Sequence, residues 1–195
     1  MKIDIQKNKE KIETLLGVTD MEKEERLNLL KWLEESGFYT APASSRYHLN
    51  VEGGLAQHSL NVHKALRDID NGFVPHNLGA SSMIIVSLLH DVCKIGLYKD
   101  NILKSGKRSI SIPYQKEEDF PIGHGEKSVF LLQKHITLTE QEAVCIRWHM
   151  GHYDYAFKSN ENYIKAKYPE AFLVHFADHI ATLFLDPEYE GSDEK

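Results

Sequence analysis

A nearly unbroken apolar run occupies residues 83–89 and is followed at once by the pair His90-Asp91. The surrounding segment, residues 77–91, is predicted to be a helix that is apolar on almost every side, so other elements must cover it all round. The run is too short to cross a bilayer, which needs about 20 consecutive apolar residues. The sequence therefore predicts a deeply buried helix with two ionisable side chains at its end.

Apolar residues at helical spacing predict further helices on both sides of this segment. Glu142 lies three residues after Thr139, which is the pattern of a capping box at the start of one of them. An irregular stretch is expected over residues 38–54, where proline, serine and glycine are frequent. The predicted helices are residues 3–16, 21–36, 55–71, 77–91, 124–135, 139–150 and 169–185. We therefore predict an all-α fold, a helical bundle.

The signals for β-structure gather in residues 99–115. A Ser-Gly turn there precedes the alternating run Ser109-Ile110-Ser111-Ile112. Strict alternation of polar and apolar residues is typical of a half-buried strand. This segment is predicted to form one small β-hairpin.

The composition is that of an ordinary globular protein, with 42% hydrophobic and 27% charged residues in 195. We expect one domain over residues 1–195, with a core at about 53–185 and the helices of residues 1–37 packed on it. The net charge of −6 argues against a protein that binds nucleic acid mainly through its surface. The charged N-terminus and the cysteines, Cys93 and Cys145, favour a cytoplasmic protein with free thiols and no membrane partner.

Several of the 11 histidines fall where a helix is expected to face the core or to end. His58, for example, lies on the apolar stripe of its predicted helix, and Asp178 lies on the apolar face of the last one. Lone ionisable groups on apolar faces are costly unless they are paired or bind a metal. One shared divalent cation explains the whole set most simply: His58, His90, Asp91, His124, His149 and Asp178.

The chemistry of this set restricts the metal. Imidazole and carboxylate ligands without a thiolate fit Mn, Fe, Zn, Ni or Co. They do not fit a structural zinc site, which is usually rich in cysteine. Neighbouring His90 and Asp91 cannot share one helix face, but the backbone can relax at a helix end and let both reach one ion or two adjacent ions.

The order of these residues resembles the HD-domain phosphohydrolase superfamily. The segments that carry the resemblance follow the family's order over about 130 residues. They are GGLAQHSLNVH (53–63), LLHDVCKIG (88–96), GHGEKSV (123–129), IRWHMGHYD (146–154) and HFADHIA (175–181). One departure is Cys93, which stands where the commoner motif has glycine and is expected to narrow the space beside Lys94.

The resemblance implies a helical enzyme that hydrolyses phosphate esters or anhydrides with one or two divalent ions. It implies that His58, His90, Asp91 and Asp178 are the core metal ligands. His124 and His149 match the extra histidines that serve a second ion, with Asp91 bridging the two.

The same resemblance suggests how such a site would work. A bound cation lowers the pKa of its water to about 7 and neutralises charge on the phosphoryl oxygens. Lys94 matches a lysine often found after the His-Asp pair and would donate to a non-bridging oxygen. Asp91 and Lys94 are therefore the expected catalytic residues.

Other polar residues near these motifs admit two interpretations each. Arg46 would either grip a phosphate or form a surface ion pair. His152 would either contact substrate or lie at the surface, and His175 and His179 are expected to pack or to hydrogen-bond near Asp178. A basic run is either a solvated face or a cover over the site: Lys99, Lys104, Lys107 and Arg108.

The sequence thus favours a metal-dependent phosphohydrolase of a small phosphorylated substrate, with a nucleotide expected. The alternatives are a nuclease for single-stranded RNA or DNA, a non-catalytic metal-stabilised nucleotide sensor, and a di-iron oxygenase. The acidic balance argues against the nuclease. The presence of Lys94 beside a full ligand set argues mildly against the sensor.

Overall fold

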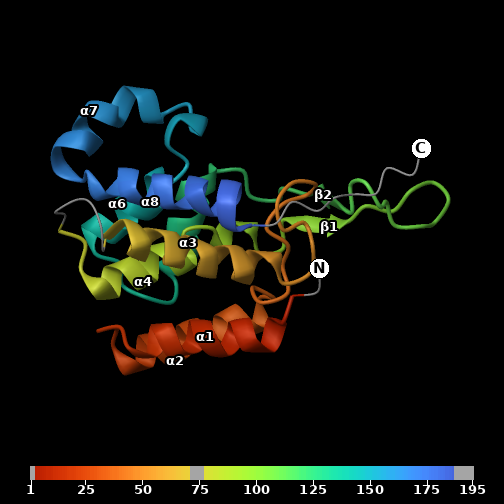
Figure 1. Cartoon of the computed structure of the whole chain (residues 1–195), viewed down its shortest axis with the longest axis horizontal. Helices are drawn as coiled ribbons and strands as arrows, with labels where there is room; N and C mark the ends of the chain where they lie inside the picture. Colours follow the sequence, from red (N-terminus) through yellow and green to blue (C-terminus); the bar gives the residue numbers. More distant parts are fainter. Residues whose placement is uncertain (1–2, 71–76, 187–195) are drawn as a thin grey trace.

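The computed structural model describes residues 3–70 and 77–186 (Figure 1). In these ranges the chain is all-α with one small antiparallel hairpin, which confirms the predicted fold class. The α-helices are α1 (Ile5–Gly17), α2 (Lys23–Glu35), α3 (Gly54–Asp70), α4 (Ala80–Leu89), α5 (His124–Leu132), α6 (Glu140–Trp148), α7 (Phe157–Lys167) and α8 (Glu170–Ile180). The remaining elements are the 3-10 turns η1 (Val92–Lys94) and η2 (Gly151–Tyr153), the strands β1 (Tyr98–Asp100) and β2 (Tyr114–Lys116), and the π-helical turn η3 (Ala181–Leu185).

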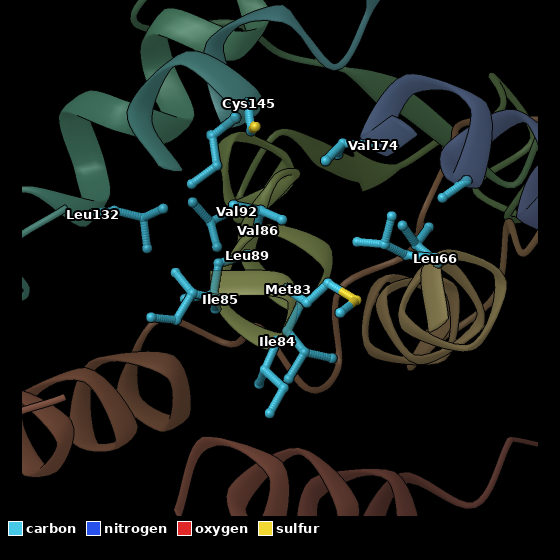
Figure 2. Packing of buried hydrophobic residues seen from close by; sticks show 14 of the residues in the cluster. Leu66, Met83, Ile84, Ile85, Val86, Leu89, Val92, Leu132, Cys145 and Val174 are labelled. Carbon is cyan, nitrogen blue, oxygen red and sulfur yellow. The ribbon is translucent and has the colours of Figure 1, made fainter. Parts of the chain in front are cut away.

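Helix α4 is the buried helix that the apolar run predicts. Every residue from Met83 to Leu89 is buried, and α4 packs against α1, α3 and α6. Figure 2 shows its side chains directed toward neighbouring helices on several sides. The last turn of α4, which is followed by His90 and Asp91, is therefore held inside the protein.

Helices α3, α8, α6 and α5 form the frame around the end of α4. Helix α3 packs against α8, α6 packs against both α5 and α8, and α5 also contacts η1. The approach of α5 to α6 depends on Gly125, because a Cβ at that position would collide with the carbonyl of Arg147. The predicted capping box, Thr139 with Glu142, starts α6. These contacts bring helix ends that carry histidines together.

Helices α1 and α2 lie side by side along the outside of the bundle, at the bottom of Figure 1. Helix α1 packs on α3 and α4, and the amide of Asn8 donates to Oε1 of Gln57 at 3.0 Å. None of the described helices is both long and apolar enough to cross a membrane.

The predicted small hairpin is present, but its strands lie at the two ends of the predicted segment. Strands β1 and β2 pair Tyr98 with Lys116 and Asp100 with Tyr114. The alternating run between them is not a strand: Ile110 and Ile112 are exposed, because this segment projects away from the helices (Figure 1) and has no core to face. Alternation alone therefore misplaced the strand.

Helix α7 and the interruption of the last helix were not predicted. Helix α7 buries only Phe157 and Ile164, so its sequence carries little periodic signal. The predicted helix 169–185 is interrupted, since α8 ends at Ile180 and continues as the π-helical turn η3. The predicted helix 55–71 is observed as far as Asp70, and residue 71 lies outside the described ranges.

Candidate metal centre

The predicted ligand residues lie at one place, where the ends of α4 and α6 and the start of α5 meet α3 and α8. His90 is the C-cap of α4, His149 is the C-cap of α6, and His124 is the first residue of α5. Asp91 leaves the helix with φ −110° and ψ 17°, so its side chain can turn toward the same point as that of His90. His58 on α3 and Asp178 on α8 complete the set.

The carboxylate of Asp91 lies in the middle of the histidines. Its Oδ2 is 3.7 Å from Nε2 of His58 and 3.5 Å from Nε2 of His90. Its Oδ1 is 2.7 Å from Nε2 of His124 and 3.4 Å from Nε2 of His149. Each oxygen of one carboxylate thus faces a different pair of imidazoles, which is the arrangement needed to bridge two adjacent cations.

Three of these imidazoles have an unsatisfied nitrogen inside the protein. Nε2 of His58, His90 and His149 is buried and makes no hydrogen bond of good geometry, although Oδ1 of Asp178 lies 3.1 Å from Nε2 of His58 and Oδ1 of Asp91 lies 3.4 Å from Nε2 of His149. Their Nδ1 atoms donate instead, to Asp186 at 2.7 Å, to the carbonyl of Ser87 at 2.9 Å and to the carbonyl of Ile146 at 2.7 Å.

An acceptor at Nδ1 fixes the proton of a neutral imidazole there and leaves the lone pair on Nε2 free to bind a metal. Buried polar atoms without a partner are rare, because each costs the energy of its lost hydration. The donor set thus fits a divalent cation.

Ligand atoms also lie close enough together for one ion at each side of Asp91. His58, His90 and Asp178 form one such group, and His90, Asp91 and His149 form another, with ligand atoms within 4.8 Å of one another. Asp91, Cys93 and His124 meet the same criterion, but burial raises the pKa of the Cys93 thiol and keeps it protonated. The described residues therefore contain a buried His/Asp cluster able to hold a metal ion.

The charges in this cluster balance one another. Burial alone would raise the pKa of Asp91, but Lys94, His90 and His124 hold that pKa well below its ordinary value. Lys94 is also buried, and its Nζ lies 2.7 Å from Oδ2 of Asp91. Burial acts to lower the pKa of Lys94, but the Asp91 carboxylate raises this pKa by more than burial lowers it, so the lysine stays charged.

Two histidines make the stability of the metal-free protein depend on pH, His58 on the alkaline side and His48 on the acid side. Burial lowers the pKa of His58, but the carboxylates of Asp178 and Asp186 outweigh burial and raise it from 6.5 to about 9. Stabilisation from His58 is therefore complete below pH 6.5 and is lost as the pH rises through about 9. Burial lowers the pKa of His48 to about 4, so His48 makes folding less favourable as the pH falls below 6.5.

We therefore expect the metal-free protein to be most stable near pH 6.5 and to lose stability on either side. Added Mn²⁺ is expected to reverse the alkaline side, because metal binding needs a neutral His58 and strengthens as the pH rises. Thermal unfolding in chelator and in Mn²⁺ at a series of pH values measures both effects. An alkaline decline that Mn²⁺ leaves unchanged would contradict the assignment of His58 as a ligand.

A pocket of about 740 Å³ opens onto this cluster. Asp91, Lys94 and Asp178 line it together with Met150, Tyr153, His175, His179, Thr182 and Leu183. Residues 46–48 form another part of its wall, and the exposed guanidinium of Arg46 lies 4.9 Å from the ring of Tyr47. A substrate in this pocket would thus meet a charged inner region and a wall rich in aromatic rings.

Two sequence-predicted features lie away from the pocket lining. His152 is exposed, packs edge-on against Phe157 with ring centroids 5.0 Å apart, and lies 3.8 Å from Glu161. The basic run is also exposed, on the segment that carries the hairpin, and its Arg108 pairs with Asp100 at 2.8 Å. The solvated interpretation therefore fits the basic run better than a cover over the site.

The structure also adds residues that the sequence did not single out. Asp186 accepts a hydrogen bond from Nδ1 of His58. The ring centroids of His48 and His58 lie 5.3 Å apart.

His175 donates to the carbonyl of His149 at 2.6 Å, which is the hydrogen-bonding role expected near Asp178. His175 also requires Gly151, with φ +50°, because a Cβ there would collide with its ring.

Cys93 takes up the space that glycine would leave open. Its backbone N–H donates to Oγ of Ser128 on α5 at 3.2 Å, and its buried thiol lies 3.9 Å from Oδ1 of Asp91. The residue therefore packs between the His-Asp turn and α5, close to Lys94.

Comparison of the chain with protein-family models, with curated proteins and with solved structures gave no match. The interpretation of the site therefore depends on the geometry of its own residues.

Proposed function

We propose that the protein is a metal-dependent phosphohydrolase of the HD type. The observation that carries this proposal is the group of three buried, unpartnered Nε2 atoms around a carboxylate whose two oxygens face opposite pairs of histidines. One or two divalent ions of the Mn, Fe, Zn, Ni or Co class satisfy these atoms. His58, His90, Asp91 and Asp178 would hold one ion, and Asp91, His124 and His149 would hold the other.

A divalent cation in this site supplies a water of pKa about 7 and positive charge for the phosphoryl oxygens. The chain contributes the arrangement around it. Asp91 joins the two sides of the site, and the backbone carbonyls of Ser87 and Ile146 keep His90 and His149 in the orientation that presents Nε2. Lys94 lines the pocket with its charge held in place by Asp91, and from there it donates to a non-bridging phosphoryl oxygen.

The form of the pocket supports a small phosphorylated substrate, and a nucleotide in particular. A volume of about 740 Å³ is in the range of small-molecule sites. The ring of Tyr153 stacks on that of His179 with centroids 5.5 Å apart and an angle of 23° between planes, and both residues line the pocket. The rings of Tyr153 and His179 offer a flat surface on which a nucleobase could stack. The guanidinium of Arg46, at the exposed wall, could hydrogen-bond to a further phosphate.

The proposal is tested by incubating a panel of substrates with Mn²⁺, and then with Co²⁺, Zn²⁺, Ni²⁺ and Fe²⁺, and by following the products by phosphate release and by chromatography, which also detects ring opening of cyclic nucleotides. The panel contains nucleoside mono- and triphosphates, cyclic nucleotides, and a short oligonucleotide whose cleavage is followed on gels. We expect hydrolysis of one or more of the mononucleotides (the nucleoside mono- and triphosphates and the cyclic nucleotides), and we expect a chelator to abolish this hydrolysis. Cleavage of the oligonucleotide alone, with a steep dependence on salt, would mean a nuclease instead. Tight nucleotide binding without turnover in every metal would mean a sensor.

A further inference from the structure

Asp186 ends the part of the chain that the structure describes on the C-terminal side, directly after the π-helical turn η3. Its side chain is fully buried, yet it lies beside the proposed metal site. Oδ2 accepts from Nδ1 of His58 at 2.7 Å, and Oδ1 accepts from the amide of Asn61 at 2.7 Å. Both carboxylate oxygens are therefore engaged by α3.

His58 differs from the other two orphaned imidazoles in the partner of its Nδ1. His90 and His149 donate to backbone carbonyls three residues earlier in their own helices. His58 donates to a carboxylate 128 residues away in the sequence. An anionic acceptor makes the imidazole a stronger ligand than a neutral carbonyl does, because it stabilises the positive charge that the ring gains on binding a cation.

The π-helical turn explains how this carboxylate reaches His58. The backbone N–H of Asp186 donates to the carbonyl of Ala181 at 2.8 Å, which closes a turn one residue wider than that of an α-helix. Asp178, on the preceding α8, places Oδ1 3.1 Å from Nε2 of the same ring. One continuous segment thus faces both nitrogens of His58, Asp178 from the metal side and Asp186 from behind.

We propose that Asp186 is a positioning residue that strengthens His58 as a metal ligand and so sets the affinity of the site. The inference depends on the proposed function, because it assumes that His58 binds a metal through Nε2. Among the described residues, the polar side chains that face Asp186 are those of His58, Asn61 and His48, and Nε2 of His48 lies 3.9 Å from Oδ2. Its negative charge is thus directed mainly at His58.

The first test is the affinity for Zn²⁺ of the wild type and of Asp186→Asn, measured by competition with a chelator. Asparagine keeps the shape and an acceptor oxygen but removes the charge. We expect binding to weaken by about 10- to 100-fold, the effect typical of losing an outer partner of a metal-bound histidine. The matched control is Asp68→Asn on the exposed surface of α3, where Asp68 pairs with Lys64 and, among the described residues, lies away from the metal cluster; its affinity should equal that of the wild type.

Each outcome of this comparison has a separate meaning. Equal affinities of the wild type and Asp186→Asn would overturn the inference and leave the proposed function standing. No measurable binding by the wild type of Zn²⁺, nor of Mn²⁺, Co²⁺, Ni²⁺ or Fe²⁺, would overturn both.

A second measurement decides the matter if Asp186→Asn does not fold. In wild-type protein with ¹⁵N-labelled histidine and bound Zn²⁺, NMR should place the His58 proton on Nδ1 and the metal on Nε2. A metal on Nδ1, or a proton on Nε2, would overturn the inference. Asn61→Ala removes the hydrogen bonds of Asn61 to Oδ1 of Asp186, to the carbonyl of Leu185 and from Gln57, but it leaves Oδ2 of Asp186 on His58. It should keep this pattern and weaken Zn²⁺ binding less than Asp186→Asn does.

Discussion

Asp91→Asn is expected to lose metal-dependent phosphate release almost completely, by at least about 10³-fold in kcat/KM. Asparagine has the shape of aspartate but no charge, so it cannot join two cations or offset the buried charge of Lys94. Both oxygens of Asp91 take part in the site, one facing His58 and His90 and the other His124 and His149. Initial rates with Mn²⁺ on the best substrate of the panel measure the loss.

The matched control for this variant is Asp100→Asn. Asp100 lies on β1, pairs with the exposed Arg108 and does not line the pocket that opens onto Asp91. Its replacement removes the same charge and should leave the rate within about twofold, as is usual for surface substitutions. If Asp91→Asn is folded by circular dichroism and turns over like the wild type, the proposed role of Asp91 is wrong.

Lys94→Met should lower kcat by about 10²- to 10³-fold, the loss that follows removal of one preorganised donor to a developing charge. The buried Nζ of Lys94 lies 2.7 Å from Asp91 and lines the pocket, so its charge is available to a phosphoryl group next to that carboxylate. Methionine preserves most of the apolar length of the side chain. Because Lys94 is not a metal ligand, bound metal should remain while turnover falls.

The comparison variant is Lys99→Met, on the exposed surface of β1. It removes one positive charge from the same region of the sequence without touching the pocket, and its kcat should match that of the wild type. If Lys94→Met loses bound metal as well as turnover, the lysine supports the structure of the site and does not act on the substrate. Unchanged kcat would remove Lys94 from the catalytic residues.

The sequence predicted the helical core and the group of possible ligands for clear physical reasons. A run as apolar as residues 83–89 has to be buried, and the His90-Asp91 pair had to be buried with it. His58 and Asp178 fell on apolar faces by helical spacing, and the structure places His58 between the carboxylates of Asp91 and Asp178. Adjacent His90 and Asp91 reach one point because α4 ends at Leu89, which the helix-end argument anticipated.

Other parts of the site depend on contacts that local patterns do not encode. Asp186 meets His58 only because the π-helical turn η3 shifts the chain, and no spacing rule predicts such a turn. His48 lies in an irregular loop whose course is set by tertiary packing. The surface helix α7 has little apolar periodicity, and the hairpin register depends on pairing between β1 and β2 instead of on the alternating run.

Metal content decides whether the buried cluster is a metal centre. Wild-type protein and Asp91→Asn are loaded with Mn²⁺, dialysed against metal-free buffer and analysed for bound metal per chain. We predict up to two equivalents on the wild type and a clear loss on Asp91→Asn, since both sides of the site use that carboxylate. Wild-type protein that retains no metal, here or with Zn²⁺, Co²⁺, Ni²⁺ or Fe²⁺, would contradict the metal centre and the hydrolase built on it.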